Sequence, residues 1–218
     1  LSEQGWKLTA KSMDETVSDG SIGPLPIEAI AARVSYEKTS LTTDISEETL
    51  GMVETAPMTF TATRIDIQPS LDELGPVRSE VETRITEHAR EQLVDRLEAA
   101  GVRDIAREKT TSLTLESGTT TDVAEYQGTY PIEDVTVPVI DDHQLTIESP
   151  ELPITALLAV WTDGDGYLVG GGAYPAENFQ TSTREEVTDA ITVSVDVDLG
   201  LDPEAHRSEL FDLISRLR

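Results

Sequence analysis

Cysteine is absent from this chain of 218 residues. The absence excludes disulfide bonds, thiolate metal sites and a cysteine nucleophile. Long hydrophobic runs are missing as well, since no stretch approaches the roughly 20 apolar residues of a membrane-spanning helix. Aromatic residues amount to only 5% of the chain. The hydrophobic core of a chain of this length needs most of them, which leaves few for an aromatic binding surface.

Positive charge is also scarce. Sixteen basic residues face 42 acidic ones, which gives a net charge of −26, and lysine occurs only at positions 7, 11, 38 and 109. Such a surface repels itself in dilute salt, but at molar salt the Debye length falls to roughly 3 Å and the repulsion is screened. The acids are spread along the whole chain, a distribution that is typical of extreme halophiles. An acidic protein from a salt-poor environment is the alternative.

The charge balance also bears on partners and location. Phosphate binding requires positive charge, so nucleic acid is not expected as a partner. Loosely bound hydrated cations are expected around the carboxylates. No signal peptide is visible, yet the sequence begins with Leu1 rather than methionine. We therefore expect that a leader or membrane tether upstream of Leu1 has been removed.

Apolar periodicity predicts an α+β fold that is built mainly from an antiparallel sheet. Residues 27–38 fit both a helix and a strand, and Pro24 and Pro26 with the β-branched residues favour a strand. Residues 18–26 are expected to form a turn. In the last strand, alternate apolar residues should pack on one face. The strands are expected at 5–13, 27–38, 58–67, 109–117, 119–133, 134–140, 143–149, 154–161, 166–174 and 191–201.

Two helices are predicted to pack on this sheet. The central helix spans about residues 79–100, with Ser79 and Glu82 at capping-box spacing and Gly101 suited to its end. A C-terminal helix is predicted at about 203–217, with Asp202 as its N-cap. We expect a single domain, 1–218, whose hinge, if it has one, lies near 69–76. The apolar face of the central helix repeats every four residues, at Val81, Ile85, Ala89, Leu93 and Leu97.

The segment WTDGDGYLVGGGAYPAE at 161–177 admits three interpretations. A calcium-binding EF-hand loop that began at Asp163 would require an acidic residue or asparagine two positions after Asp165 and a glycine next to it, and both are missing. A dinucleotide loop fails because Pro175 stands where the third glycine is required. The third interpretation is a β-hairpin with DGDG as its turn. Asp163 and Asp165 are kept as candidate ligands of an irregular cation site.

The three consecutive glycines at 170–172 lie inside the second strand of this predicted hairpin. Glycine inside a strand marks a bulge or a place where another element approaches closely. We therefore predict that a helix or an aromatic ring packs directly over these glycines.

No catalytic or cofactor-binding motif is recognised. The nucleophile motif G-x-S-x-G is absent, and the histidines at 88, 143 and 206 lie far apart along the chain. Paired carboxylates for hydrolysis cannot be singled out among 42 acids. Five aromatic residues could line a binding groove in the folded chain, namely Tyr126, Tyr130, Tyr167, Tyr174 and Trp161.

Three stretches carry a family resemblance. They are QGW at 4–6, the long helix followed by GV at 101–102, and LLAVWTDGDGYLVGGGAYPAE at 157–177. Together they resemble a haloarchaeal domain family without an assigned function, whose members are often lipoprotein-like. The resemblance covers most of the chain, implies a tether outside the cell through a lipidated cysteine, and brings no catalytic residues. No such cysteine is present here.

A weaker resemblance concerns architecture alone. An antiparallel sheet closed by a C-terminal helix is similar to the α/β/α sandwich of PsbP/Mog1-type proteins. Those proteins act mainly as binding or assembly partners, and the analogy implies a similar role here without naming a site.

These observations favour a non-catalytic domain of an extreme halophile that binds an unidentified protein or small ligand. It is expected to be exported and anchored at the cell surface, with the cytoplasm as the alternative location. Two other functions stay open, a carboxylate-based hydrolase assisted by a divalent metal and a carrier of a small ligand. No cofactor and no catalytic residue is predicted. A deep cleft with two or three converging acids would favour the hydrolase.

Overall fold

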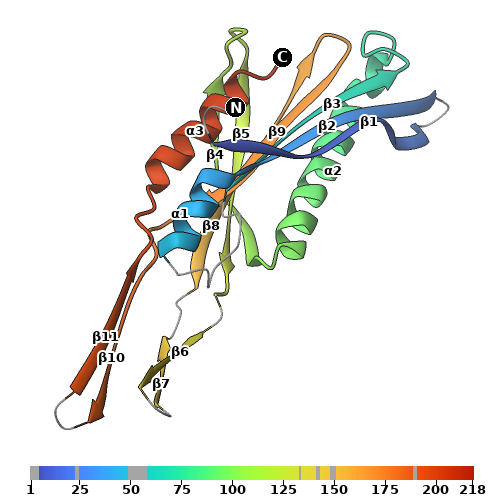
Figure 1. The fold of residues 1–218 in the computed structure, drawn as a ribbon. Coiled ribbons are helices and arrows are strands. Elements are labelled where there is room, and N and C mark those ends of the chain that lie inside the picture. Colours follow the sequence, from blue (N-terminus) through green and yellow to red (C-terminus); the bar gives the residue numbers. More distant parts are fainter. Residues whose placement is uncertain are drawn as a thin grey trace.

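The computed structural model describes residues 5–22, 25–48, 58–132, 134–140, 143–147, 151–188 and 191–218. The predicted α+β fold is confirmed, because a long helix and a C-terminal helix accompany an antiparallel sheet (Figure 1). The elements follow in the order β1 (Trp6–Ile22), β2 (Leu25–Lys38), α1 (Thr39–Glu48), β3 (Thr59–Gln68), the 3₁₀ turn η2 (Gly75–Val77), α2 (Arg78–Ala99), β4 (Arg103–Thr114), β5 (Thr120–Tyr130), β6 (Val135–Ile140), β7 (His143–Ile147), β8 (Leu152–Asp163), β9 (Gly166–Pro175), β10 (Gln180–Thr188), β11 (Ile191–Asp198) and α3 (Pro203–Ser215).

Seven strands form the main sheet in the order β1-β2-β3-β9-β8-β5-β4. Each pair of neighbours in this sheet is antiparallel. The hairpins β10–β11 and β6–β7 form separate two-stranded sheets that extend away from it (Figure 1). The connectivity places β9, near the end of the chain, at the centre of the sheet.

Helices α2 and α3 cover opposite faces of the main sheet. Successive side chains of a strand point to opposite faces, and β9 shows both. A Cβ added at Gly170 would lie 3.4 Å from Ile214, and one added at Gly172 would lie 3.0 Å from Leu210, both on α3. Gly171, between them, faces the space beneath α2. The prediction that a helix packs directly on the glycine run is therefore confirmed for Gly170 and Gly172.

The hairpin interpretation of DGDG is also confirmed. Strands β8 and β9 pair without interruption up to Asp163 and Gly166, which leaves two residues in the turn. Gly164 has a φ of +59°, whereas Asp165 is not among the residues with positive φ. This combination is typical of a type II′ turn, which matches the twist of the two strands.

The ends of α2 follow their sequence signals only in part. The capping-box prediction is wrong, because η2 leads directly into the helix and no side chain caps its first turn. Ser79 consequently lies inside the helix. At the other end, Gly101 N–H donates to Glu98 O and Val102 N–H to Leu97 O, both at 2.9 Å. This is the Schellman pattern expected of a C-terminal glycine.

The start of α3 was predicted correctly and its end to within two residues. The Asp202 carboxylate accepts a hydrogen bond of 3.0 Å from the backbone N–H of Ala205. This bond satisfies one of the donors that the first turn of a helix leaves without a partner. The helix ends at Ser215, two residues before the predicted boundary.

Several local predictions differ from the structure. Most of the segment 18–26, which was expected to be a turn, is strand, because β1 continues to Ile22 and β2 begins at Leu25. Helix α1 and strand β10 were not foreseen. The packed face expected for β11 is half-exposed at Val193, Val195 and Val197, because the β10–β11 hairpin extends beyond the main sheet. The expected hinge segment buries Leu71 and Leu74 to 2% exposure each; its bending stays a prediction.

A candidate ligand groove between α2 and the sheet

A groove lies between α2 and the face of the sheet that this helix covers. Its volume is about 670 Å³, which falls within the range of roughly 300–1,000 Å³ that is usual for small-molecule sites. Strands β2 and β3 supply most of its floor, with further residues from β9 and β8, and α2 supplies its wall. The lining is mainly aliphatic and includes Ile27, Ile65, Ile85, Leu93, Ile154 and Leu158.

The apolar face of α2 explains why this groove is open. The five apolar residues that repeat every four positions from Val81 to Leu97 form the α2 stripe. Only the two at its ends, Val81 and Leu97, are buried. Ile85, Ala89 and Leu93 lie between them, are half-buried and line the groove. The helix is thus most deeply buried at its two ends, while the middle of its apolar face packs against the core on one side and lines the groove on the other.

The register of β2 and β3 gives the groove an apolar end and a polar band. Ile65 faces the groove near its apolar end. The next pair on this face, two residues further along β2 and β3, is Arg33 opposite Thr63. The pair after that is Ser35 opposite Thr61. The hydroxyl oxygens of Ser35 and Thr61 are 3.1 Å apart and share a hydrogen bond. Polar groups are therefore concentrated in one stretch of a mostly apolar lining.

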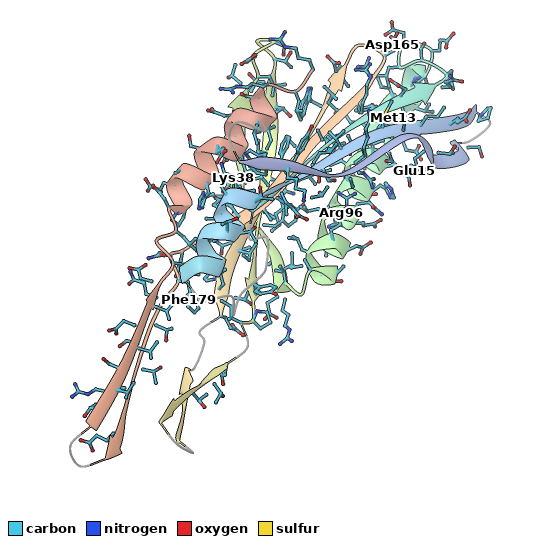
Figure 2. All side chains as sticks on the ribbon, in the orientation of Figure 1. Met13, Glu15, Lys38, Arg96, Asp165 and Phe179 are labelled. Atoms are coloured by element: carbon cyan, nitrogen blue, oxygen red, sulfur yellow. The ribbon has the colours of Figure 1, made fainter. Side chains whose placement is uncertain are left out.

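Two arginines of the groove have no partner among the described residues. Arg33 on β2 is half-buried, and its Nε atom is shielded from solvent without a hydrogen-bond acceptor. Arg96 lies on the exposed rim formed by α2, on the side toward Glu15 of β1 (Figure 2). Burial of its guanidinium and the positive charge of Arg33 lower the pKa of Arg96, and Glu15 opposes this shift. No described ion pair includes either arginine.

The charge of the lining is opposite to that of the whole chain. Three arginines, Arg33, Arg84 and Arg96, line the groove together with one acid, Glu37. Of these arginines only Arg84 is paired, through a bond of 2.8 Å to Glu80 on the same helix. In a chain of net charge −26, the groove is therefore a local region of positive charge.

A second polar cluster lies on the other face of the sheet, beneath α3. Glu125 of β5 is 2% exposed and accepts hydrogen bonds from Arg207 at 2.7 Å and from Thr111 at 2.6 Å. Lys109 lies 3.5 Å away. Burial raises the pKa of Glu125, but these hydrogen bonds and positive charges outweigh burial, so that its pKa lies below its ordinary value. The cluster joins α3 to two strands and is satisfied within the fold.

The candidate cation ligands lie at the tip of the β8–β9 hairpin. Asp163 forms an ion pair of 2.9 Å with Arg64 of β3, whereas Asp165 is exposed. In the described part of the chain, no group of three or more histidine, aspartate or glutamate side chains is placed to hold a metal ion. Cation binding by Asp163 and Asp165 stays a prediction.

The histidines and aromatic residues singled out in the sequence do not gather at one site among the described residues. His88 lines the groove on α2, whereas His206 lies on α3, across the sheet, and its shielded Nε2 atom has no partner among the residues that the structure describes. Of the five aromatic residues proposed for a groove, only Tyr130 lines it. The other four are buried in the core, which agrees with the small number of aromatic residues in the chain.

A family model now connects the whole chain to other proteins. The model, described as a domain of unknown function (DUF6517), matches residues 1–218. The chain belongs to this family. The predicted membership of a domain family without an assigned function is thereby confirmed, and the DUF6517 description assigns no role to any residue. No curated protein and no solved structure matches this DUF6517 chain.

No helix in the described part of this DUF6517 chain combines the length and apolar character required to cross a bilayer. The longest, α2, has 22 residues and carries charges on its outer face.

Proposed function

We propose that this domain is a non-catalytic binding module that holds a small apolar ligand in the groove between α2 and the sheet. The observation that carries the proposal is the half-buried middle of the α2 stripe, where Ile85, Ala89 and Leu93 face a cavity of about 670 Å³. These side chains pack against the buried core but stay half-buried, so a ligand in the groove would remove their remaining apolar surface from water. A mostly apolar cleft with a few convergent polar groups is typical of ligand sites.

The groove favours a carrier over the hydrolase alternative. Hydrolysis by carboxylates requires two acids placed around one bond. The described lining of the groove contains one acid, Glu37. The same lining contains Arg33 and Arg96, which form no ion pair among the described residues, and this favours binding of negative charge over general acid and base chemistry.

The test uses N-phenyl-1-naphthylamine, a neutral probe whose fluorescence rises in apolar surroundings. The wild-type protein should bind it in multimolar KCl. Ala89→Phe fills the groove from α2 and should weaken binding by about tenfold or more. Ala99→Phe is the matched control, because Ala99 is exposed on the same helix and lies outside the groove. No binding by the wild type, or equal binding by both variants, would contradict the proposal.

We further propose that the domain works at high salt, at the surface of a haloarchaeal cell and tethered there. The surplus of 42 acids over 16 basic residues supports the first part, because salt screens their repulsion. Thermal unfolding in dilute and in multimolar KCl tests it, and equal stability in both would contradict it. Mass spectrometry of the native protein tests the tether, and an intact cytoplasmic chain without a lipid would contradict it.

The PsbP/Mog1 analogy belongs to the same proposal. Two helices on opposite faces of an antiparallel sheet support it at the level of layers. An experimental structure of this domain would test it by its strand order, and a different order in PsbP/Mog1-type proteins would contradict it.

A further inference from the structure

We infer that the ligand is an amphiphile with an oxyanion head group, a carboxylate or a phosphate, which Arg33 and Arg96 bind while its apolar chain occupies the groove. The inference rests on the proposed function, since it names the class of ligand that the groove accepts. It adds a polar anchor to an otherwise apolar site.

The first argument is the lack of partners for these arginines. A charged group near an apolar cavity loses solvation unless it is paired, and in this chain carboxylates outnumber basic residues by 42 to 16. Even so, neither Arg33 nor Arg96 forms an ion pair among the described residues, and Arg33 leaves a shielded Nε–H without an acceptor. Arg84, on the same helix as Arg96, is paired with Glu80.

The second argument is the chemistry of the two groups. A guanidinium presents its N–H donors in a planar fork that matches the two oxygens of a carboxylate or phosphate. Arg33 and Arg96 come from β2 and α2, the floor and the wall of the groove. Their like charges are close enough that Arg33 lowers the pKa of Arg96. An anion between them would neutralise this repulsion.

The third argument is their position along the groove. Arg33 and Thr63 lie opposite each other, two residues from the aliphatic side chain of Ile65. Arg96 is exposed at the rim. A head group at the arginines would therefore keep contact with water on one side, while an attached chain would extend along Ile65 and Ile85. A free inorganic anion would use the arginines but leave the apolar lining empty.

Other charged and titratable groups near this position do not cancel its positive charge. Glu15 of β1 acts on Arg96 across the groove but is exposed. Glu37 and His88 also belong to the lining. None of these three forms an ion pair with Arg33 or Arg96 in the described structure.

The experiment compares two fluorescent probes that share one ring system. N-phenyl-1-naphthylamine is neutral, and 8-anilino-1-naphthalenesulfonate differs from it by a sulfonate. Decanol, decanoate and decyl phosphate are then used to displace the neutral probe, with inorganic phosphate as a further arm. All titrations are carried out in the same KCl solution, so that screening and chloride competition are constant.

The variants are Arg33→Gln and Arg96→Gln, with Arg84→Gln as the matched control. Each of the first two should weaken the sulfonate probe, decanoate and decyl phosphate by about tenfold or more, because each removes a charged hydrogen-bond donor. Affinity for the neutral probe and for decanol should stay within about twofold of the wild type, which also shows that the groove is intact. Arg84→Gln should change none of these affinities. Arg96 is exposed, so its variant provides the test if Arg33→Gln does not fold.

The outcomes separate the inference from the proposed function. If the wild type binds neither probe, both fail. If it binds the neutral probe, but decanoate is no better a competitor than decanol or the arginine variants change nothing, the inference alone is overturned. If inorganic phosphate binds as tightly as decyl phosphate, the arginines hold a free anion and the amphiphile is ruled out.

Discussion

The carboxylate of Glu125 accepts a hydrogen bond of 2.7 Å from Arg207 although Glu125 is only 2% exposed. The pair joins β5 to α3, and Arg207 also stacks on Phe211 at 4.3 Å. Burial alone would raise the pKa of Glu125, but the bonds from Thr111 and Arg207 lower it below 4.5. The ion pair that joins α3 to β5 therefore requires Glu125 to be ionised.

Replacing Arg207 by glutamine should destabilise the protein at neutral pH by about 1–3 kcal/mol, because Glu125 stays buried and charged with fewer partners. The loss should lie in the lower half of that range, because the Arg207 side chain is 37% exposed and solvent partly screens its charge. A depressed folded pKa contributes stability above the unfolded value that is lost as pH falls through the folded value. The difference between wild type and variant should therefore shrink below about pH 4.5. Chemical denaturation at several pH values measures it.

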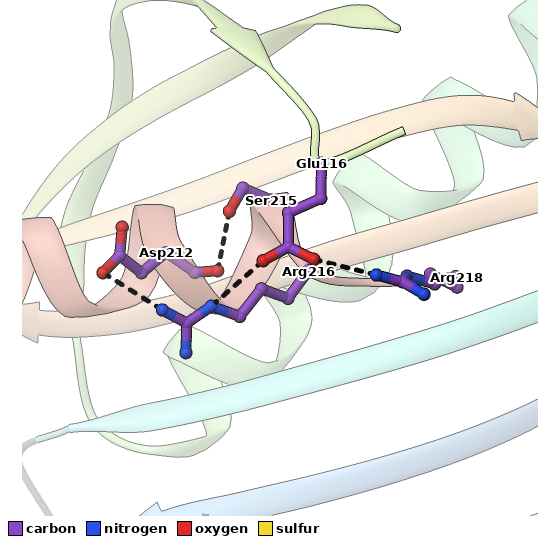
Figure 3. A network of polar contacts seen from close by, with 5 residues as sticks. All are labelled: Glu116, Asp212, Ser215, Arg216 and Arg218. Carbon is purple, nitrogen blue, oxygen red and sulfur yellow. Dashed lines mark hydrogen bonds and ion pairs between the residues drawn. The ribbon is translucent and has the colours of Figure 1, made fainter. Parts of the chain in front are cut away.

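The control for that experiment lies at the end of the same helix. Arg216 and Arg218 contact Glu116 of the β4–β5 turn at 3.6 and 3.0 Å, and Arg216 also contacts Asp212 (Figure 3). These side chains are 46–79% exposed. Arg216→Gln should change stability by no more than about 1 kcal/mol. An equal loss in the Arg216 and Arg207 variants would show that burial of Glu125 is not the cause.

The glycine run supplies a second prediction. A Cβ at Gly172 would lie 2.3 Å from the backbone oxygen of Thr59, whereas at Gly170 its closest neighbour is the end of the Leu217 side chain at 2.8 Å. A side chain can rotate away but the β3 backbone cannot, so Gly172→Ala should cost about 1–3 kcal/mol. Gly170→Ala should cost less. The free energies of unfolding of both variants, measured by guanidinium denaturation, test this prediction. A Gly172→Ala protein as stable as the wild type would show that the β3 backbone moves to accommodate the methyl group.

Several elements were predictable because their signals are local. The hairpin at 161–177 follows from two apolar runs separated by DGDG, and the end of α2 follows from Gly101. The start of α2 was predicted to within one residue, but its cap was not, because η2 replaces the capping box. Helix α1 has few apolar residues, so its sequence contains no clear helical repeat.

The groove could not be predicted from the α2 stripe. The repeat of Ile85, Ala89 and Leu93 is the same whether these side chains pack on the sheet or face a cavity, and the outcome depends on how the sheet curves beneath the helix. One signal was available in β2. The face of β2 that lines the groove carries Ala29, Ala31 and then Arg33. A charged residue therefore stands where the alternation along the strand predicts an apolar one.

The β8–β9 turn supplies a third prediction. If Asp163 and Asp165 bind a cation, Arg64 competes with it, because Arg64 occupies Asp163 at 2.9 Å and this carboxylate raises the arginine's pKa. Arg64→Gln should therefore bind Ca²⁺ more tightly than the wild type, and Asp165→Asn should reverse the gain. Calorimetric titration with CaCl₂ at constant ionic strength measures both. Equal affinity in the wild type and Arg64→Gln would remove the cation site from consideration.

Arg33 leads to a final prediction that concerns stability rather than affinity. Arg33 has a shielded Nε–H without an acceptor among the described residues and lies close to a second positive charge, so we expect it to destabilise the ligand-free fold. Arg33→Gln should therefore raise the unfolding free energy of the empty protein by about 0.5–2 kcal/mol, as residues kept for binding often do when replaced. Arg84→Gln breaks its exposed pair with Glu80 and should instead lose about 0.3–0.5 kcal/mol.

Thermal unfolding with and without decanoate makes this prediction sharper. A ligand that binds only the folded state raises the melting temperature of the protein by mass action. Decanoate should stabilise the wild type and have a much smaller effect on Arg33→Gln, while decanol should stabilise both equally. An empty Arg33→Gln protein that is less stable than the wild type would mean that Arg33 supports the fold, and its missing partner would then no longer indicate a ligand.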